Sequence, residues 1–94
     1  MNVITSDGTV IFSHGKLRGG SKLTWLACRN ERKPVLHIDL LVNSTDAAAN
    51  KIRLWLRNFD IEKLNVAGPR ASKDPDIYAA VRGVLELLFK GIKK

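Results

Sequence analysis

Residues 7–24 read Asp-Gly-Thr-Val-Ile-Phe-Ser-His-Gly-Lys-Leu-Arg-Gly-Gly-Ser-Lys-Leu-Thr, and this stretch decides the fold. The turn signal Asp7-Gly8 precedes a short run of β-branched and aromatic residues, so we predict a strand at residues 9–13. A glycine-rich loop follows at residues 14–20, and we predict a helix from about residue 21 to residue 32. A strand, a glycine loop and a helix in this order are typical of α/β proteins.

The same order of strand, loop and helix occurs twice more. We predict a second strand at residues 34–38 and a weaker third strand at residues 62–66. Ser44, Thr45 and Asp46 offer caps for a helix between these strands. Its apolar residues fall on one helical face: Ala48, Ile52, Trp55, Leu56 and Phe59.

The last helix has the clearest start signal of the chain. Asp74 can cap it and Pro75 fits its first helical position. We expect Gly91 and the lysines beyond it to end the helix. Its predicted apolar face consists of Ile77, Val81, Val84, Leu85 and Leu88.

Alternating strands and helices predict βαβ units and a parallel sheet covered on both faces. The expected fold is therefore α/β, a three-layer Rossmann-like arrangement with a small parallel sheet, in one domain over residues 1–94. Sheets usually hold about four to six strands. Because three strands leave a small sheet, we expect a homo-oligomer that covers the incomplete side.

The 94 residues carry a formal charge of +7, from 16 Lys and Arg against 9 Asp and Glu. Such a charge favours anionic partners, namely nucleic acid, phosphorylated small molecules or a membrane surface. Of these we expect a phosphorylated small molecule and no membrane. We disfavour nucleic acid, because the cations are scattered and no aromatic array lies among them. With no targeting or membrane-spanning segment evident and a lone Cys28, we expect a cytoplasmic protein without disulfides.

Two predicted loops carry cations and no carboxylate where parallel sheets bind ligands, at the carboxyl ends of the strands. Glycines beside a helix N-terminus can cradle a phosphate, although they can equally make a tight turn capped by Ser21. In the second loop, Arg70 can grip a phosphate with two hydrogen bonds. The residues predicted to bind an anion are Gly19, Gly20, Ser21, Lys22, Thr24, Gly68, Pro69, Arg70, Ser72 and Lys73.

Other chemically capable residues have plainer interpretations. Asp39, which ends the second strand, either bonds ribose hydroxyls or caps its own turn, and we favour the cap. His37 and Cys28 are expected to pack in the interior, and His14 contacts a ligand or nothing. Trp25 is expected in the core, with the alternative that it flanks a ligand. The sequence shows no general acid/base pair, so we expect no catalysis.

Four strings, taken in order, resemble the molybdenum carrier family, the circularly permuted YpsA-like branch of the SLOG superfamily. They are residues 6–13 (Ser-Asp-Gly-Thr-Val-Ile-Phe-Ser), 19–24 (Gly-Gly-Ser-Lys-Leu-Thr), 33–39 (Lys-Pro-Val-Leu-His-Ile-Asp) and 64–72 (Leu-Asn-Val-Ala-Gly-Pro-Arg-Ala-Ser). The last string, with Pro75 and Tyr78 downstream of it, is the most specific. Family members begin with a further Gly-Gly-Gln-Thr-Gly-Ala-Asp type motif, so the resemblance implies an N-terminally shortened domain.

The resemblance implies a Rossmann-like protein that binds a phosphorylated or nucleotide-derived ligand at the two glycine loops. The family name adds the molybdenum cofactor as a candidate ligand. A related branch of the superfamily hydrolyses nucleoside monophosphates with catalytic Glu and Arg residues. Because residues 25–28 (Trp-Leu-Ala-Cys) carry no such Glu, we expect a binding or carrier protein. A basic nucleic-acid-binding domain and a hydrolase-like enzyme remain as alternatives.

Overall fold

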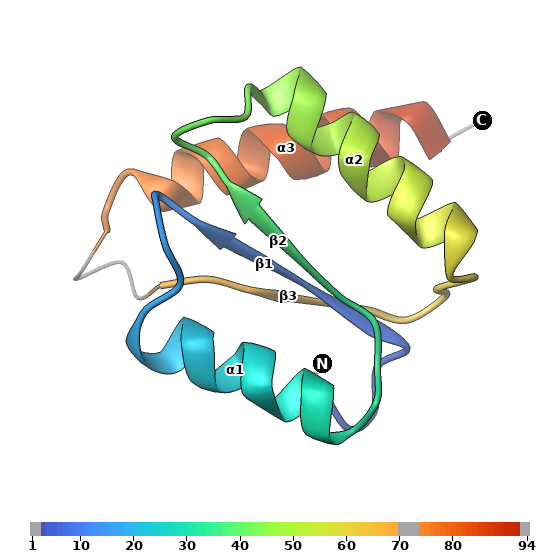
Figure 1. Cartoon of the computed structure of the whole chain (residues 1–94). Helices are drawn as coiled ribbons and strands as arrows, with labels where there is room; N and C mark the ends of the chain where they lie inside the picture. Colours follow the sequence, from blue (N-terminus) through green and yellow to red (C-terminus); the bar gives the residue numbers. More distant parts are fainter. Residues whose placement is uncertain (1–2, 70–73, 93–94) are drawn as a thin grey trace.

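The computed structural model describes residues 3–69 and 74–92 as alternating strands and helices (Figure 1). The elements in chain order are β1 (Gly8–Ser13), α1 (Gly19–Asn30), β2 (Val35–Asp39), α2 (Thr45–Asn58), β3 (Leu64–Ala67) and α3 (Ile77–Ile92). Figure 1 shows α1 on one face of the sheet and α2 with α3 on the other face. The α/β, three-layer Rossmann-like fold predicted from the sequence is therefore confirmed.

The three strands are parallel and lie in the order β2-β1-β3. The chain moves from β1 to β2 through α1 and then back across β1 to β3 through α2. Because these two crossovers run in opposite directions, crossovers of the same hand place α1 and α2 on opposite faces. The central position of β1 brings the ends of all three strands around the loop that follows it.

The hydrophobic core lies between the sheet and the α2–α3 layer. Alternate residues of β1, Val10 and Phe12, point into it and are fully buried. Ile52 of α2 and Leu88 of α3 pack against them. Because β1 is packed in this core, the position of its end, from which the following loop begins, is fixed by the packing.

The α1 face of the sheet is held partly by polar contacts. Thr9 is buried on this face, and its Oγ1 accepts a hydrogen bond from Nδ2 of Asn65 at 3.2 Å. The bond joins β1 to the edge strand β3. Cys28 of α1 is buried, as expected. A guanidinium lies over the indole of Trp25, with Cζ of Arg29 4.9 Å from the ring centroid.

Two helix boundaries differ from the sequence-based prediction. Helix α1 begins at Gly19 rather than at Ser21, because the backbone of Arg18 is extended and serves as the N-cap position. Helix α3 begins at Ile77, after a turn at Pro75, and runs to Ile92, so Gly91 does not end it. One glycine costs a helix about 1 kcal/mol, which is too little to stop one with an apolar face in the core.

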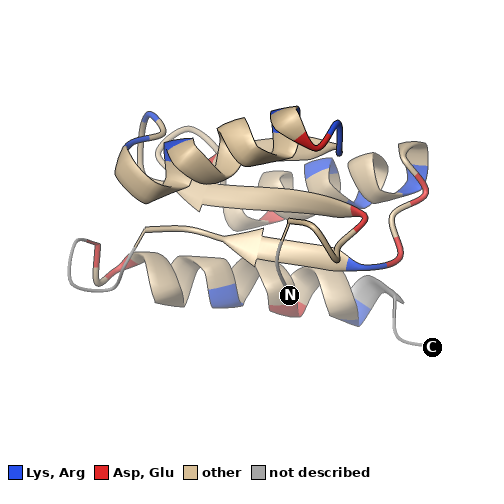
Figure 2. Ribbon diagram, turned by 90° about the horizontal axis from the view of Figure 1, so that it is seen from below, with Lys and Arg blue, Asp and Glu red and all other residues tan. Residues whose placement is uncertain are grey.

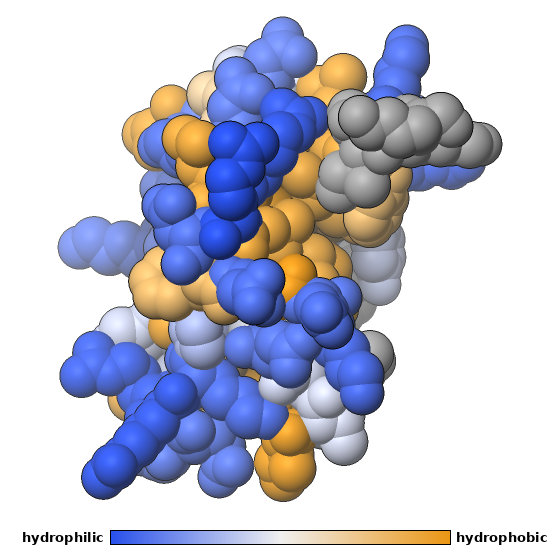
Figure 3. All heavy atoms as spheres, turned by 90° about the vertical axis from the view of Figure 1, so that its right-hand side faces the viewer, coloured by the Kyte–Doolittle hydropathy of each residue, from blue (hydrophilic) through white to orange (hydrophobic). Residues whose placement is uncertain are grey.

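The end of the sheet at which the strands begin lies opposite the predicted ligand loops. Figure 3 shows this side of the molecule, where hydrophobic side chains reach the surface between larger areas of hydrophilic side chains. No helix among the described residues is long and apolar enough to span a membrane.

Candidate functional site

The candidate site lies where β1 and β3 end. These neighbouring strands lead to helices on opposite faces, β1 to α1 and β3 to α3 (Figure 1). Ligands of open parallel sheets bind at such points, because the diverging connections leave a crevice beyond the strand ends. A cavity of about 800 Å³ opens here. Its lining consists of Ser13, His14, Lys16, Arg18, Gly19, Gly20, Ser21, Thr24, Gly68, Pro69 and Asp74.

The N-terminus of α1 forms one wall of this cavity and is uncapped. Arg18, in the N-cap position, makes no side-chain capping bond, and the first turn holds no acidic residue. The first N–H groups of a helix have no partners within it, and they carry the positive end of the helix dipole. Helix α2, in contrast, is capped. Oγ of Ser44 accepts a hydrogen bond from the amide of Ala47 at 3.1 Å, and Asp46 lies in the first turn of this helix.

Glycines make this helix end accessible. Gly19 has a φ of +51°, a region that residues with a Cβ rarely adopt. A Cβ placed on Gly19 or on Gly20 would meet no atom within 4 Å apart from its chain neighbours and the backbone of its own helix, so the space beside both residues is open. Gly68, on the opposite wall, allows close packing of the backbone, since a Cβ at this position would lie 3.3 Å from the carbonyl oxygen of Phe12.

The charges around the cavity are mostly positive. Figure 2 shows basic residues in the loop before α1 and acidic residues before α3 at the same end of the sheet. Lys16 and Arg18 are exposed and line the cavity. Asp74 is the one carboxylate among the described lining residues, and its Oδ2 lies 2.6 Å from Nδ1 of His14. The cavity therefore presents two cations and a histidine–carboxylate pair.

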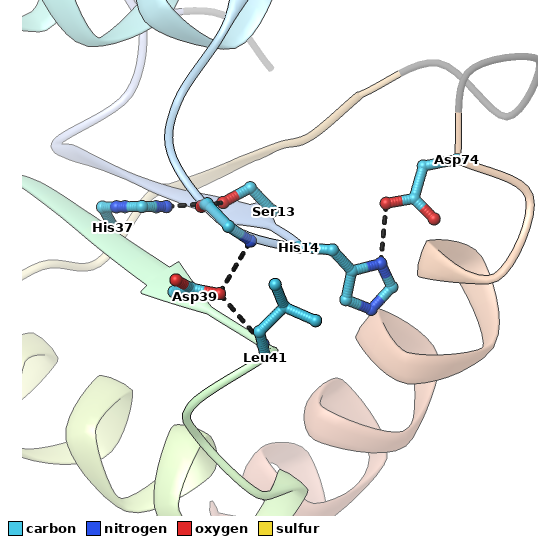
Figure 4. Close-up of polar contacts among 7 residues, drawn as sticks. Ser13, His14, His37, Asp39, Leu41 and Asp74 are labelled. Atoms are coloured by element: carbon cyan, nitrogen blue, oxygen red, sulfur yellow. Dashed lines mark hydrogen bonds and ion pairs between the residues drawn. The ribbon is translucent and has the colours of Figure 1, made fainter.

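A network of hydrogen bonds fixes the loop between β1 and α1 (Figure 4). Oδ1 of Asp39, at the end of β2, accepts the amides of Gly15 at 2.8 Å and of Leu41 at 2.9 Å. Oγ of Ser13 donates to the carbonyl of Gly15 at 2.6 Å and accepts from Nε2 of His37 at 2.6 Å. Gly15 itself has a φ of +96°. These hydrogen bonds hold the loop in a defined conformation.

These contacts settle two interpretations of the sequence. The expected turn cap at Asp39 is confirmed, and the same oxygen also holds the neighbouring loop. His37 is half-buried and bonded to Ser13, as expected of a packed histidine. Trp25 is not among the cavity residues, so the described structure does not support its role beside a ligand.

We expect low pH to reduce the stability that the folded protein gains from the Asp39 carboxylate. The backbone amides of Gly15 and Leu41 stabilise its carboxylate and hold its pKa below the ordinary value of 3.8. A carboxyl with a lowered pKa in the folded state contributes stability above its unfolded pKa, and that contribution is lost as the pH falls through the folded pKa. We expect the melting temperature of Asp39→Asn to lie below that of wild type near pH 7, and the difference to shrink below about pH 4.

Thermal melts between pH 7 and pH 3 measure this difference. Asp60→Asn, at the opposite end of the sheet and with an exposed side chain, is the matched control. Asp7 also accepts two backbone amides, those of Glu62 and Lys63, but it is present in every protein compared. A difference for Asp39→Asn that stays constant over the whole pH range would contradict the prediction.

The structure brings most of the predicted anion-binding residues together. Six line the cavity: Gly19, Gly20, Ser21, Thr24, Gly68 and Pro69. Lys22 is exposed but is not among the lining residues. Arg70, Ser72 and Lys73 lie outside the described residues.

Two hydroxyls have different partners from those expected. Ser21 lies buried within the first turn of α1 instead of capping it. Thr24 donates its hydroxyl proton to the carbonyl of Gly20 at 3.0 Å, as helical threonines commonly do. Its Oγ1 is therefore left as an acceptor rather than as a donor to an anion.

Sequence reasoning missed part of the cavity lining. It placed Lys16 and Arg18 in a basic loop at the ligand edge of the sheet but did not name them as binding residues, and it treated Ser13 as strand and Asp74 as a helix cap. The glycine-loop position was a usable signal for Lys16 and Arg18. None existed for the pairing of His14 with Asp74, because 60 positions separate them along the chain.

The described residues contain no cluster of three or more His, Cys, Asp or Glu side chains arranged to hold a metal ion. Groups available to a ligand are therefore backbone amides, two cations and the His14–Asp74 pair.

Comparison with known proteins agrees with the resemblance read from the motifs. The model of the circularly permutated YpsA SLOG family matches residues 1–89. This chain belongs to that family. The chain is also similar, with 50% identity and a TM-score of 0.91, to a solved structure from Syntrophus aciditrophicus SB named "Putative molybdenum carrier protein". The match covers 93% of this chain and 55% of the other.

This chain therefore spans about half the length of that relative. No curated protein matches it. The family resemblance inferred from the four sequence strings is confirmed by both positive comparisons, and the same glycine loop that carried the resemblance forms a wall of the cavity.

Proposed function

We propose that this protein binds the phosphate of a phosphorylated or nucleotide-derived ligand in the cavity between the β1–α1 loop and the start of the β3–α3 connection. The observation that carries the proposal is the uncapped N-terminus of α1, which opens through Gly19 and Gly20 into a cavity lined by Lys16 and Arg18. Backbone amides at a helix N-terminus bind phosphate through hydrogen bonds and the helix dipole together. The two side chains add mobile positive charge around it.

A carrier role for the molybdenum cofactor is the more specific form of this proposal. It is supported by the name of the relative from Syntrophus aciditrophicus and by family membership. The cofactor would be cargo, held by its phosphate at the α1 N-terminus while the rest of the molecule fills the cavity. The expected location is the cytoplasm, where phosphorylated ligands are available.

Calorimetric titration tests the phosphate site directly. The probes are inorganic phosphate, pyrophosphate, AMP and ADP-ribose at low salt. We expect at least one to bind, and we expect the double variant Lys16→Ala with Arg18→Ala to bind it about tenfold or more weakly, since the loss of even one bond to a charged group costs about 1.5–3 kcal/mol. The control pairs Arg57→Ala with Lys63→Ala, which removes the same charge at the opposite end of the sheet.

Two outcomes would count against the proposal. One is that none of the four probes binds to wild type. The other is that both double variants lose the same affinity, because the attraction would then come from net charge and not from the cavity.

We further propose that a second copy of the chain covers the outer face of α3. This face carries exposed Tyr78 and Phe89 at its two ends, with Val81 and Leu85 half-buried between them. Arg82 and Glu86 lie on the same face, so two antiparallel α3 helices would set each Arg82 opposite the partner's Glu86. Light scattering should give twice the chain mass of 10.5 kDa. A monomer at every concentration would overturn this assignment.

A further inference from the structure

The strongest unexplained feature of the cavity is the His14–Asp74 pair. His14 follows β1, Asp74 precedes α3, and Nδ1 of the imidazole lies 2.6 Å from Oδ2 of the carboxylate. The side chains are 26% and 20% exposed, so both are partly shielded but still reached by water. Figure 4 shows the imidazole with its second nitrogen turned away from Asp74.

This arrangement fixes the chemistry of the ring. Ionised Asp74 can only accept, so Nδ1 of neutral His14 carries the proton and donates it. The lone pair is then left on Nε2, where it can take a proton. A histidine oriented by a carboxylate on its other nitrogen is the recurrent form of a general base in enzymes.

Simple charge neutralisation does not account for the pair. Lys16 and Arg18 line the same cavity and are the stronger partners for a carboxylate, yet Asp74 contacts His14. A partly exposed pair of this kind contributes little to stability.

We propose that His14 is a general base for the hydrolysis of phosphate monoesters in this cavity, with Asp74 as the residue that positions it. The inference rests on the proposed phosphate site. Oxygen of a water molecule attacks phosphorus while Nε2 of His14 takes one of its protons. A new P–O bond forms and the P–O bond to the ester oxygen breaks. The ester oxygen leaves on the opposite side of phosphorus with the bonding electrons and takes a proton from solvent water, giving an alcohol and inorganic phosphate, while the imidazolium returns its proton to solvent.

The surroundings of the pair suit this reaction. Charge that develops on the phosphoryl oxygens would meet the free amides at Gly19 and Gly20 and the cations of Lys16 and Arg18. The hydrogen bonds of Asp39 and Ser13 already hold the loop that carries His14. Hydrolysis needs only water as a second reactant, and the cavity is open to it.

Phosphate release from p-nitrophenyl phosphate, AMP and ribose 5-phosphate tests the inference, with wild type and variants purified in parallel to expose contaminating phosphatases. We expect turnover by wild type, and a kcat reduced by about 10²-fold or more in His14→Ala, the usual contribution of a general base. Phosphate affinity, measured by calorimetry, should change by less than about threefold. Asp74→Asn should lower kcat with little change in KM, and Asp60→Asn should leave both unchanged.

The failures are distinguishable. If wild type binds phosphate but releases none from any of the three esters, the catalytic inference is overturned and the binding site stands. Equal turnover by wild type and His14→Ala would also overturn the catalytic inference and leave the binding site in place. If phosphate does not bind at all, the proposed function fails together with the inference built on it. A parallel loss of binding and turnover in His14→Ala also overturns the role as base, because it makes His14 a ligand contact.

Discussion

Replacing Gly20 with aspartate is expected to weaken anion binding by about a hundredfold while leaving the fold at least as stable as wild type. Gly20 lies in the first turn of α1, and a Cβ at this position meets no atom within 4 Å apart from its chain neighbours and the backbone of its own helix. The new carboxylate would lie within about 5–6 Å of a bound phosphate, where two like charges repel by about 3 kcal/mol at an effective dielectric constant near 20. That energy corresponds to about a hundredfold loss of affinity.

The same substitution should favour the helix. A negative charge in the first turn interacts with the helix dipole by about 0.3–1 kcal/mol. Loss of a glycine adds about 0.4–1 kcal/mol by reducing the entropy of the unfolded chain. We therefore expect Gly20→Asp to raise the melting temperature while it weakens binding. This combination separates a site in the first turn of α1 from general damage to the protein.

Gly20→Asn is the matched control, because it adds a side chain of the same size without charge. Its affinity for inorganic phosphate and AMP should fall by less than about tenfold, the share that steric crowding and loss of the open amides can explain. If calorimetry shows the two variants binding phosphate equally well, no anion sits at the N-terminus of α1 and the proposed site is wrong.

The largest expected effect on stability comes from Phe12→Ala. Phe12 is fully buried at the centre of the core, on the middle strand. Removing a buried phenyl ring costs about 3–5 kcal/mol, since the lost burial adds to the cavity that remains. A chain of 94 residues is stable by only about 5–14 kcal/mol in total. The substitution should therefore remove a large part of the stability.

Urea unfolding followed by circular dichroism measures this loss. Phe59→Ala is the control, because the ring of Phe59 is 58% exposed and makes a tilted contact with Trp55 at 6.5 Å between ring centroids. We expect the control to cost about 1 kcal/mol or less. Similar losses for the two variants would mean that the side chain of Phe12 is not in the core.

Local sequence patterns were sufficient for the secondary structure and for one wall of the site. The run of β-branched residues that precedes the glycine loop predicted β1, and alternation along it placed Val10 and Phe12 on one face. Helical periodicity placed Ile52 and Trp55 on the buried side of α2. Gly19 and Gly20 were recognised because glycines between a strand and a helix have a local geometric reason to be there.

Helix ends were predicted less well, because their signals compete. Asp74 has the residue type and the position of a helix cap, but its carboxylate lies against His14. The uncapped start of α1 runs against the expectation that Ser21 would cap it. In both places a tertiary contact or an open cavity replaces the local bond that the pattern favours.

The sequence, taken alone, determined that this is a three-layer α/β protein with a glycine-rich, basic loop after its first strand, because periodicity, glycine placement and charge are local properties of the chain. Tertiary structure decided that β1 is the central strand, that Asp39 supports the loop of Gly15, and that His14 meets Asp74. Those contacts join segments far apart along the chain. They depend on strand order and on the direction of each crossover, which only the packing of the whole domain establishes.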